Sequence, residues 1–67
     1  MTSNVAGLVR EGVAAFKAGR KDEARKLLTR AAELDERNEE AWLWLSAVVD
    51  NLENQQICLE NVLAINP

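Results

Sequence analysis

The chain has 67 residues, a net charge of −3 and a hydrophobic share of 48%, which is typical of one small globular domain and not of a disordered chain. One cysteine and no histidine exclude an intrachain disulfide, a Cys/His zinc site and every His-dependent catalytic triad. The N-terminus does not read as a signal peptide and no apolar run is long enough to cross a membrane, so we expect a soluble, cytoplasmic protein.

Charge is divided unevenly along the chain. Residues 1–37 hold all eight basic residues and six acids, about +2, whereas residues 38–67 hold five acids and no base, −5. These charges have two interpretations: they are solvated faces, or they favour head-to-tail contact between copies. Acids are interleaved with the bases, and no basic patch with aromatic residues is present, so we expect no binding to nucleic acid.

The N-terminal half predicts two helices joined by a glycine turn. One of the polar residues at positions 2–4 can cap the first helix, and Gly19 follows its last turn. The second helix begins near Asp22 and Glu23, whose charges suit a helix N-terminus. Its expected core-facing residues are Ala24, Leu27, Leu28, Ala31 and Leu34.

The C-terminal half predicts two further helices. Asn38 is a suitable N-cap for the third, residues 51–54 form a polar break that includes possible caps, and Pro67 marks the end of the fourth. The expected buried stripe of the third helix is Ala41, Trp42, Leu45, Val48 and Val49, and that of the fourth is Ile57, Cys58, Val62 and Ile65. Because the connections are short, we expect an all-α fold of four helices in two antiparallel hairpins.

A repeat of 34 residues relates the two halves. Leu8 and Trp42 are separated by this spacing, as are Gly12 and Ser46, and the first unit contains the turn Ala18-Gly19-Arg20 followed by Asp22-Glu23-Ala24 and Ala31-Ala32-Glu33-Leu34-Asp35. In these features the chain resembles the tetratricopeptide repeat family. The resemblance implies a single domain, with repeat 1 at about residues 5–38 and repeat 2 at about residues 39–67.

The second unit departs from the family pattern. It has about three fewer residues than the family spacing and no glycine in its internal turn. Gln55 or Gln56 stands where the family has a small alanine, and in the first unit Glu36 replaces the usual proline. We therefore expect a tighter turn in the second hairpin. Separately, we expect these residues to be one domain of a longer protein.

The resemblance implies a scaffold for protein–protein contact that is not an enzyme and has no cofactor. Trp42 is interpreted as core between two helices and Cys58 as a small buried hydrophobic residue. Positions that would face the concave groove are mostly apolar, so a clamp for a peptide carboxylate is not expected. The candidate groove or interface residues are Val9, Val13, Phe16, Lys17, Leu43, Trp44, Ala47 and Asp50.

Two hypotheses about the contact remain open. In the first, the domain forms a homodimer through the uncovered apolar surface of its last hairpin, with or without exchange of a helix. In the second, it is a monomeric peptide-binding domain of a larger protein that uses the concave apolar groove.

Overall fold

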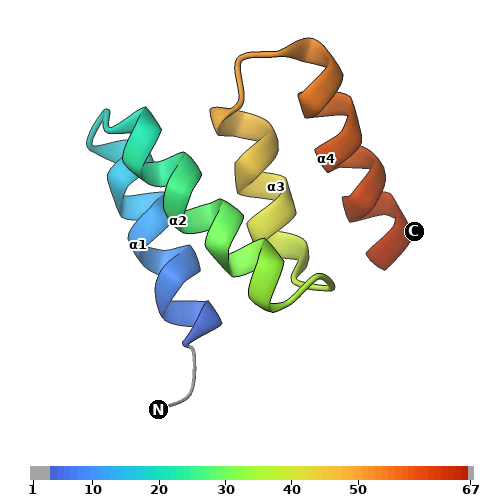
Figure 1. Cartoon of the computed structure of the whole chain (residues 1–67), viewed down its shortest axis with the longest axis horizontal. Helices are drawn as coiled ribbons and strands as arrows, with labels where there is room; N and C mark the ends of the chain where they lie inside the picture. The colour runs from blue at the N-terminus through green and yellow to red at the C-terminus, as the bar shows by residue number, and fades with distance from the viewer. Residues whose placement is uncertain (1–3, 67) are drawn as a thin grey trace.

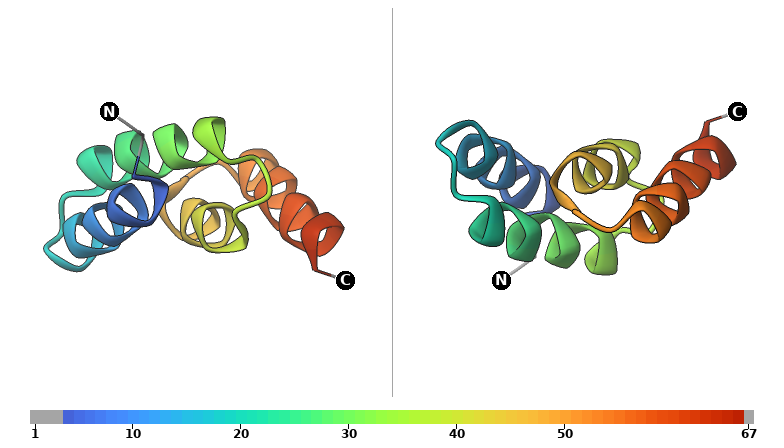
Figure 2. Two further views of the ribbon diagram at one scale, coloured as in Figure 1. Left: turned by 90° about the horizontal axis from the view of Figure 1, so that it is seen from below. Right: turned by 90° about the horizontal axis from the view of Figure 1, so that it is seen from above.

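The computed structural model describes residues 4–66, and within this range the chain forms four α-helices and no strand. The helices are α1 (Val5–Lys17), α2 (Lys21–Leu34), α3 (Glu39–Val48) and α4 (Leu52–Ile65). They form the antiparallel hairpins α1–α2 and α3–α4, which lie side by side (Figure 1). Figure 2 shows α2 along one side of α1 and α3, with α4 at the far end. The predicted all-α fold is therefore confirmed.

Asparagine side chains cap the N-termini of three of the helices. The Oδ1 atoms of Asn4, Asn38 and Asn51 accept hydrogen bonds from backbone N–H groups in the first turns of α1, α3 and α4, at 2.9, 3.0 and 2.8 Å. These bonds satisfy amides that have no partner within the helix. The predicted cap at Asn38 is confirmed, and the first cap is Asn4; Thr2 and Ser3 lie outside the described residues.

The first hairpin turns at Gly19, whose φ is 85°. In this left-handed conformation a side chain would be strained, and glycine avoids that cost. The Gly19 N–H donates to the Phe16 carbonyl at 3.0 Å, and the Arg20 N–H donates to the Ala15 carbonyl at 2.8 Å. This pair of bonds is a Schellman motif, which satisfies two carbonyls at the end of α1.

The second hairpin is shortened in a helix and not in its turn. Its connection spans residues 49–51 and the first spans residues 18–20, so both have the same length, whereas α3 has 10 residues against 13 in α1. The prediction of a tighter turn is therefore wrong. Val49 leaves the helix with extended backbone (ψ 139°), and the connection up to Asn51 needs no positive φ and hence no glycine.

Three further predictions about the helices need correction. The expected polar break at residues 51–54 is shorter than predicted: the expected cap within it is Asn51, and α4 already begins at Leu52. Leu34, expected in the core, is exposed because it is the last residue of α2. Ile57, expected on the buried face of α4, is also exposed because that side of the helix has no neighbour.

The core is built around α2. Leu28 is fully buried, and a Cβ atom on Gly12 would lie only 2.7 Å from its Cγ, so the glycine allows α1 and α2 to approach closely. Among residues 4–66, α2 packs against α1 and α3, whereas α4 packs against α3 alone. The second hairpin is therefore covered on one side only.

Candidate interaction surfaces

Four of the candidate residues lie where α1 and α3 are next to each other: Val9, Val13, Phe16 and Trp44. The rings of Phe16 and Trp44 pack edge to face, with centroids 5.8 Å apart and planes at 61°. Beside them is a depression of about 390 Å³, lined by Ala6, Val9, Arg10, Val13, Asn38, Glu40 and Trp44. The half-buried Trp44 thus joins the two hairpins and presents part of its surface in this depression.

The other four candidates lie outside this depression. Lys17, Leu43 and Ala47 are exposed on α1 and α3. Asp50 accepts a hydrogen bond of 2.6 Å from the Lys21 Nζ atom, which ties the connection before α4 to the start of α2. That bond and the lysine charge hold the pKa of the Asp50 carboxyl below its ordinary value. Asp50 therefore links the two hairpins.

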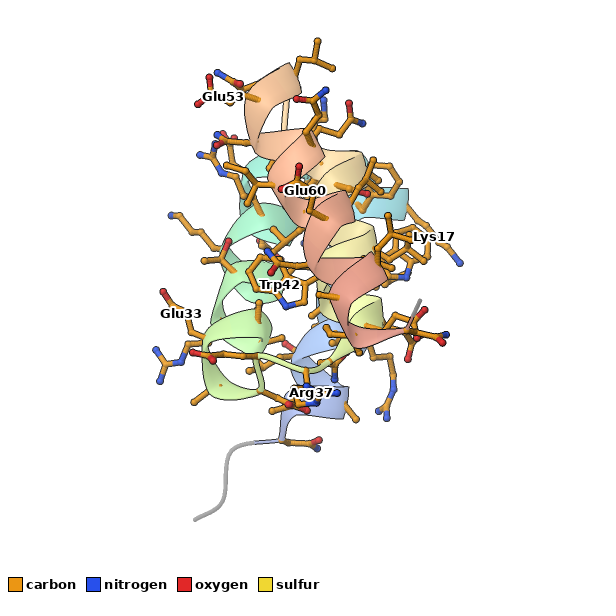
Figure 3. All side chains as sticks on the ribbon, turned by 90° about the vertical axis from the view of Figure 1, so that its right-hand side faces the viewer. Lys17, Glu33, Arg37, Trp42, Glu53 and Glu60 are labelled. Atoms are coloured by element: carbon orange, nitrogen blue, oxygen red, sulfur yellow. The ribbon has the colours of Figure 1, made fainter. Side chains whose placement is uncertain are left out.

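Trp42 is less deeply buried than expected. It is half-buried and packs against the core, and its Nε1 donates to the Glu36 carbonyl at 2.9 Å. The rest of the indole lies in a groove between α2 and α4. Figure 3 looks onto α4 and shows Trp42 between these two helices. The interpretation of Trp42 as core is therefore only partly correct.

The groove between α2 and α4 has a volume of about 740 Å³ and was not expected from the sequence. It exists because these two helices do not contact each other. Trp42, Leu45 and Val49 form its base on α3. Its α4 side includes Ile57, Cys58, Asn61, Ala64 and Ile65. The spacing of Ile57, Asn61 and Ala64 at i, i+4 and i+7 marks a second face of α4, but this spacing does not show that the face borders a groove.

Cys58 lines this groove but is buried, as predicted. Burial raises the pKa of its thiol, so the side chain stays protonated at neutral pH and is a poor nucleophile. Within residues 4–66 there is no cluster of three or more side chains suited to hold a metal ion. In the same range, every helix is too short or too polar to span a bilayer.

α4 carries four of the six large hydrophobic side chains that are exposed among the described residues. Among the described residues, the large hydrophobic side chains that are exposed on this helix are Leu52, Ile57, Leu59 and Leu63. Both α2 and α4 have 14 residues, so Leu28 and Ala32 correspond to Leu59 and Leu63. The first pair is 0% and 3% exposed, whereas the second is 42% and 61% exposed. Equivalent positions are therefore buried in the first hairpin and exposed to solvent in the second.

Comparison with known proteins gives one match. The sequence profile described as tetratricopeptide repeat matches residues 5–38, just over half of the 67-residue chain. This segment is the first hairpin with the loop that leads to α3. Neither the curated proteins nor the solved structures include a match to the chain.

Proposed function

Because the chain belongs to the tetratricopeptide repeat family, whose repeats generally mediate contacts between proteins, we propose that it is an interaction scaffold that associates with itself through the apolar surface of α4. The observation that carries the proposal is the difference between Leu28 and Leu59, two leucines at equivalent positions of which one is buried and the other 42% exposed. Leu59 shares one side of α4 with the exposed Leu52 and Leu63, and an exposed apolar face of this kind usually marks an interface.

Physical chemistry supports association through this helix. α4 buries only Cys58 among its described residues, whereas α1, α2 and α3 each bury four. Covering apolar surface contributes about 25 cal/mol per Å². Two repeats are also fewer than the roughly three that such folds usually need to bury their faces. A second copy would supply the missing neighbour.

The molar mass in solution tests this proposal. We expect light scattering after size exclusion to show a dimer that dissociates on dilution. A monomer at every concentration would refute self-association. A change in dimer stability between low and high salt would show that the opposed charges of residues 1–37 and 38–67 contribute, because exposed charge pairs are screened.

A second candidate function has its own supporting observation. The depression beside Trp44 is concave and partly apolar, with Arg10 and Glu40 among its lining residues, which suits an extended peptide with apolar side chains. Trp44 fluorescence in a Trp42→Phe background would report on added peptides. A Val13→Glu variant is the control, since a carboxylate in the depression should abolish the response. A fluorescence change that persists in this variant would exclude the depression as the site.

A further inference from the structure

We propose that α4 of one copy docks on the first hairpin of a second copy, so that the copies join head to tail. This inference rests on the proposed self-association and names the surface that receives α4. One side of the contact is the leucine face of α4, formed by Leu52, Leu59 and Leu63. The other side is the basic depression, a hollow of about 420 Å³ on α2 and the adjoining part of α1.

The leucine face of α4 carries negative charge along one flank. Its three leucines occur at i, i+7 and i+11, which places them within about 40° of one another around the helix. The charged residues of α4 are Glu53 and Glu60, which Figure 3 shows on this helix, and helical geometry places both on the same side of the leucine row. Residues 38–67 contain no base, so the second hairpin offers these carboxylates no cation.

The basic depression combines apolar and positively charged side chains. Leu8 and Leu27 are half-buried in its lining. Leu34, which is 42% exposed, follows Leu27 at i+7 and extends this apolar surface along α2. The charged lining consists of three bases and one acid, a net charge of +2: Arg25, Lys26, Arg30 and Glu33.

The bases of the depression are not engaged within their own chain. Among residues 4–66 the ion pairs are those formed by Arg20 and by Lys21, so none involves Arg25, Lys26 or Arg30. The acids in the first turn of α2 lie outside the lining. The basic depression therefore suits an acidic, apolar partner.

The groove between α2 and α4 has no such preference, because two bases and two acids line it: Arg25, Arg37, Glu33 and Glu36. An α4 helix paired with a second α4 would gather the glutamates of both copies at an interface without a base, and like charges there repel. Of these three surfaces, the basic depression is the one whose charge complements α4.

The proposed contact joins two different surfaces of the same chain. Contact of the leucine face with Leu8 and Leu27 would remove apolar surface from water, and the pairing of glutamates with bases would set the orientation. Such a contact is heterologous, so a dimer keeps one unused α4 and one unused depression. Further copies can then add at higher concentration.

Charge reversal on each side tests the pairing. One variant carries Lys26→Glu with Arg30→Glu, and the other carries Glu53→Lys with Glu60→Lys. We expect each variant alone to self-associate at least about tenfold more weakly than the wild type in light scattering, because like charges then face each other. Mixing the two variants should restore association, since each offers the other an oppositely charged surface.

Arg30→Glu and Arg37→Glu form a matched pair of single variants. Both arginines are exposed and both substitutions change the charge equally, but Arg37 lies in the loop before α3 and lines the groove between α2 and α4. We expect Arg30→Glu to weaken association at least about threefold, and Arg37→Glu to leave it within about twofold of the wild type.

The outcomes separate the two proposals. A monomeric wild-type chain would refute self-association and the head-to-tail contact together. If the wild type associates but the mixed charge-reversed variants do not, or if Arg37→Glu weakens association as much as Arg30→Glu, the head-to-tail contact is overturned while self-association through α4 stands. Circular dichroism of each variant shows whether its helices remain folded.

Discussion

The two hairpins differ in burial although their second helices are equally long. α2 packs against both α1 and α3 and buries four residues, whereas α4 contacts α3 alone and buries one. Leu28 and Leu59 are the same residue type at equivalent positions, yet one is fully buried and the other exposed. In a repeat fold, the neighbours of a helix decide which of its apolar residues become core, since each repeat contacts only the adjacent one.

The strongest test of this comparison replaces each of these leucines by alanine. We expect Leu28→Ala to destabilise the fold by about 2–5 kcal/mol, because it opens a cavity in the core. Leu59→Ala should cost less than about 1 kcal/mol, since this leucine is already 42% exposed and its loss leaves no enclosed cavity. Urea unfolding followed by circular dichroism at low protein concentration measures both. Similar losses for the two variants would show that α4 is buried in solution, as in a tight dimer.

A second test concerns the close approach of α1 and α2. Gly12→Val should destabilise the chain by about 1–3 kcal/mol, because its first added carbon would lie 2.7 Å from the Cγ of the fully buried Leu28. Ala14→Val is the matched control, since Ala14 is exposed on the same helix and the change costs only helix propensity, about 0.5 kcal/mol. Equal losses of stability in thermal unfolding would mean that α1 and α2 can move apart at Gly12 at little energetic cost.

Much of the first hairpin was predictable because its signals are local. Gly19 ends α1 through its own φ, and the acids after it favour the start of α2, so neither feature depends on a distant contact. Asn38 likewise caps α3 through a bond to a residue three positions on. Such short-range preferences can be read from one sequence.

The second hairpin was less predictable because the missing residues could have been lost either from a helix or from the turn. The spacing showed that residues were missing, but it could not show that α3 would lose them and that the turn would keep its length. Gln55 illustrates the outcome, since its amide donates to the Ser46 carbonyl at 3.0 Å near the end of the shortened helix. The groove at Trp42 was missed because it depends on the separation of α2 and α4, which no local pattern encodes.

A third test compares how the second helix of each hairpin begins. The Asn51 side chain accepts hydrogen bonds from two N–H groups of α4, whereas Arg20 makes no such bond at the start of α2. We expect Asn51→Ala to destabilise the chain by about 1 kcal/mol and Arg20→Asn to stabilise it by about 0.5 kcal/mol or more. Thermal unfolding measures both changes. A stabilising Asn51→Ala variant would contradict the cap.

The smallest expected effect concerns the ion pair between the hairpins. Asp50 and Lys21 are joined at 2.6 Å, but both side chains are largely exposed, so the pair is screened by solvent and salt. Because the hydrogen bond from Lys21, followed by its charge, lowers the pKa of Asp50 in the folded state, the stabilisation is present above the unfolded pKa. It is lost as the pH falls through the lower, folded value.

Asp50→Asn should therefore reduce stability slightly at neutral pH and leave it unchanged in strong acid. When the free energy of unfolding is measured from pH 7 to pH 2, the values for the wild type and the variant should converge below about pH 4, the ordinary pKa of aspartate. High salt should reduce the neutral-pH difference. A difference that persists unchanged at pH 2 would mean that Asp50 joins the hairpins by packing or neutral hydrogen bonding, and that the contact between the repeats is not electrostatic at this point.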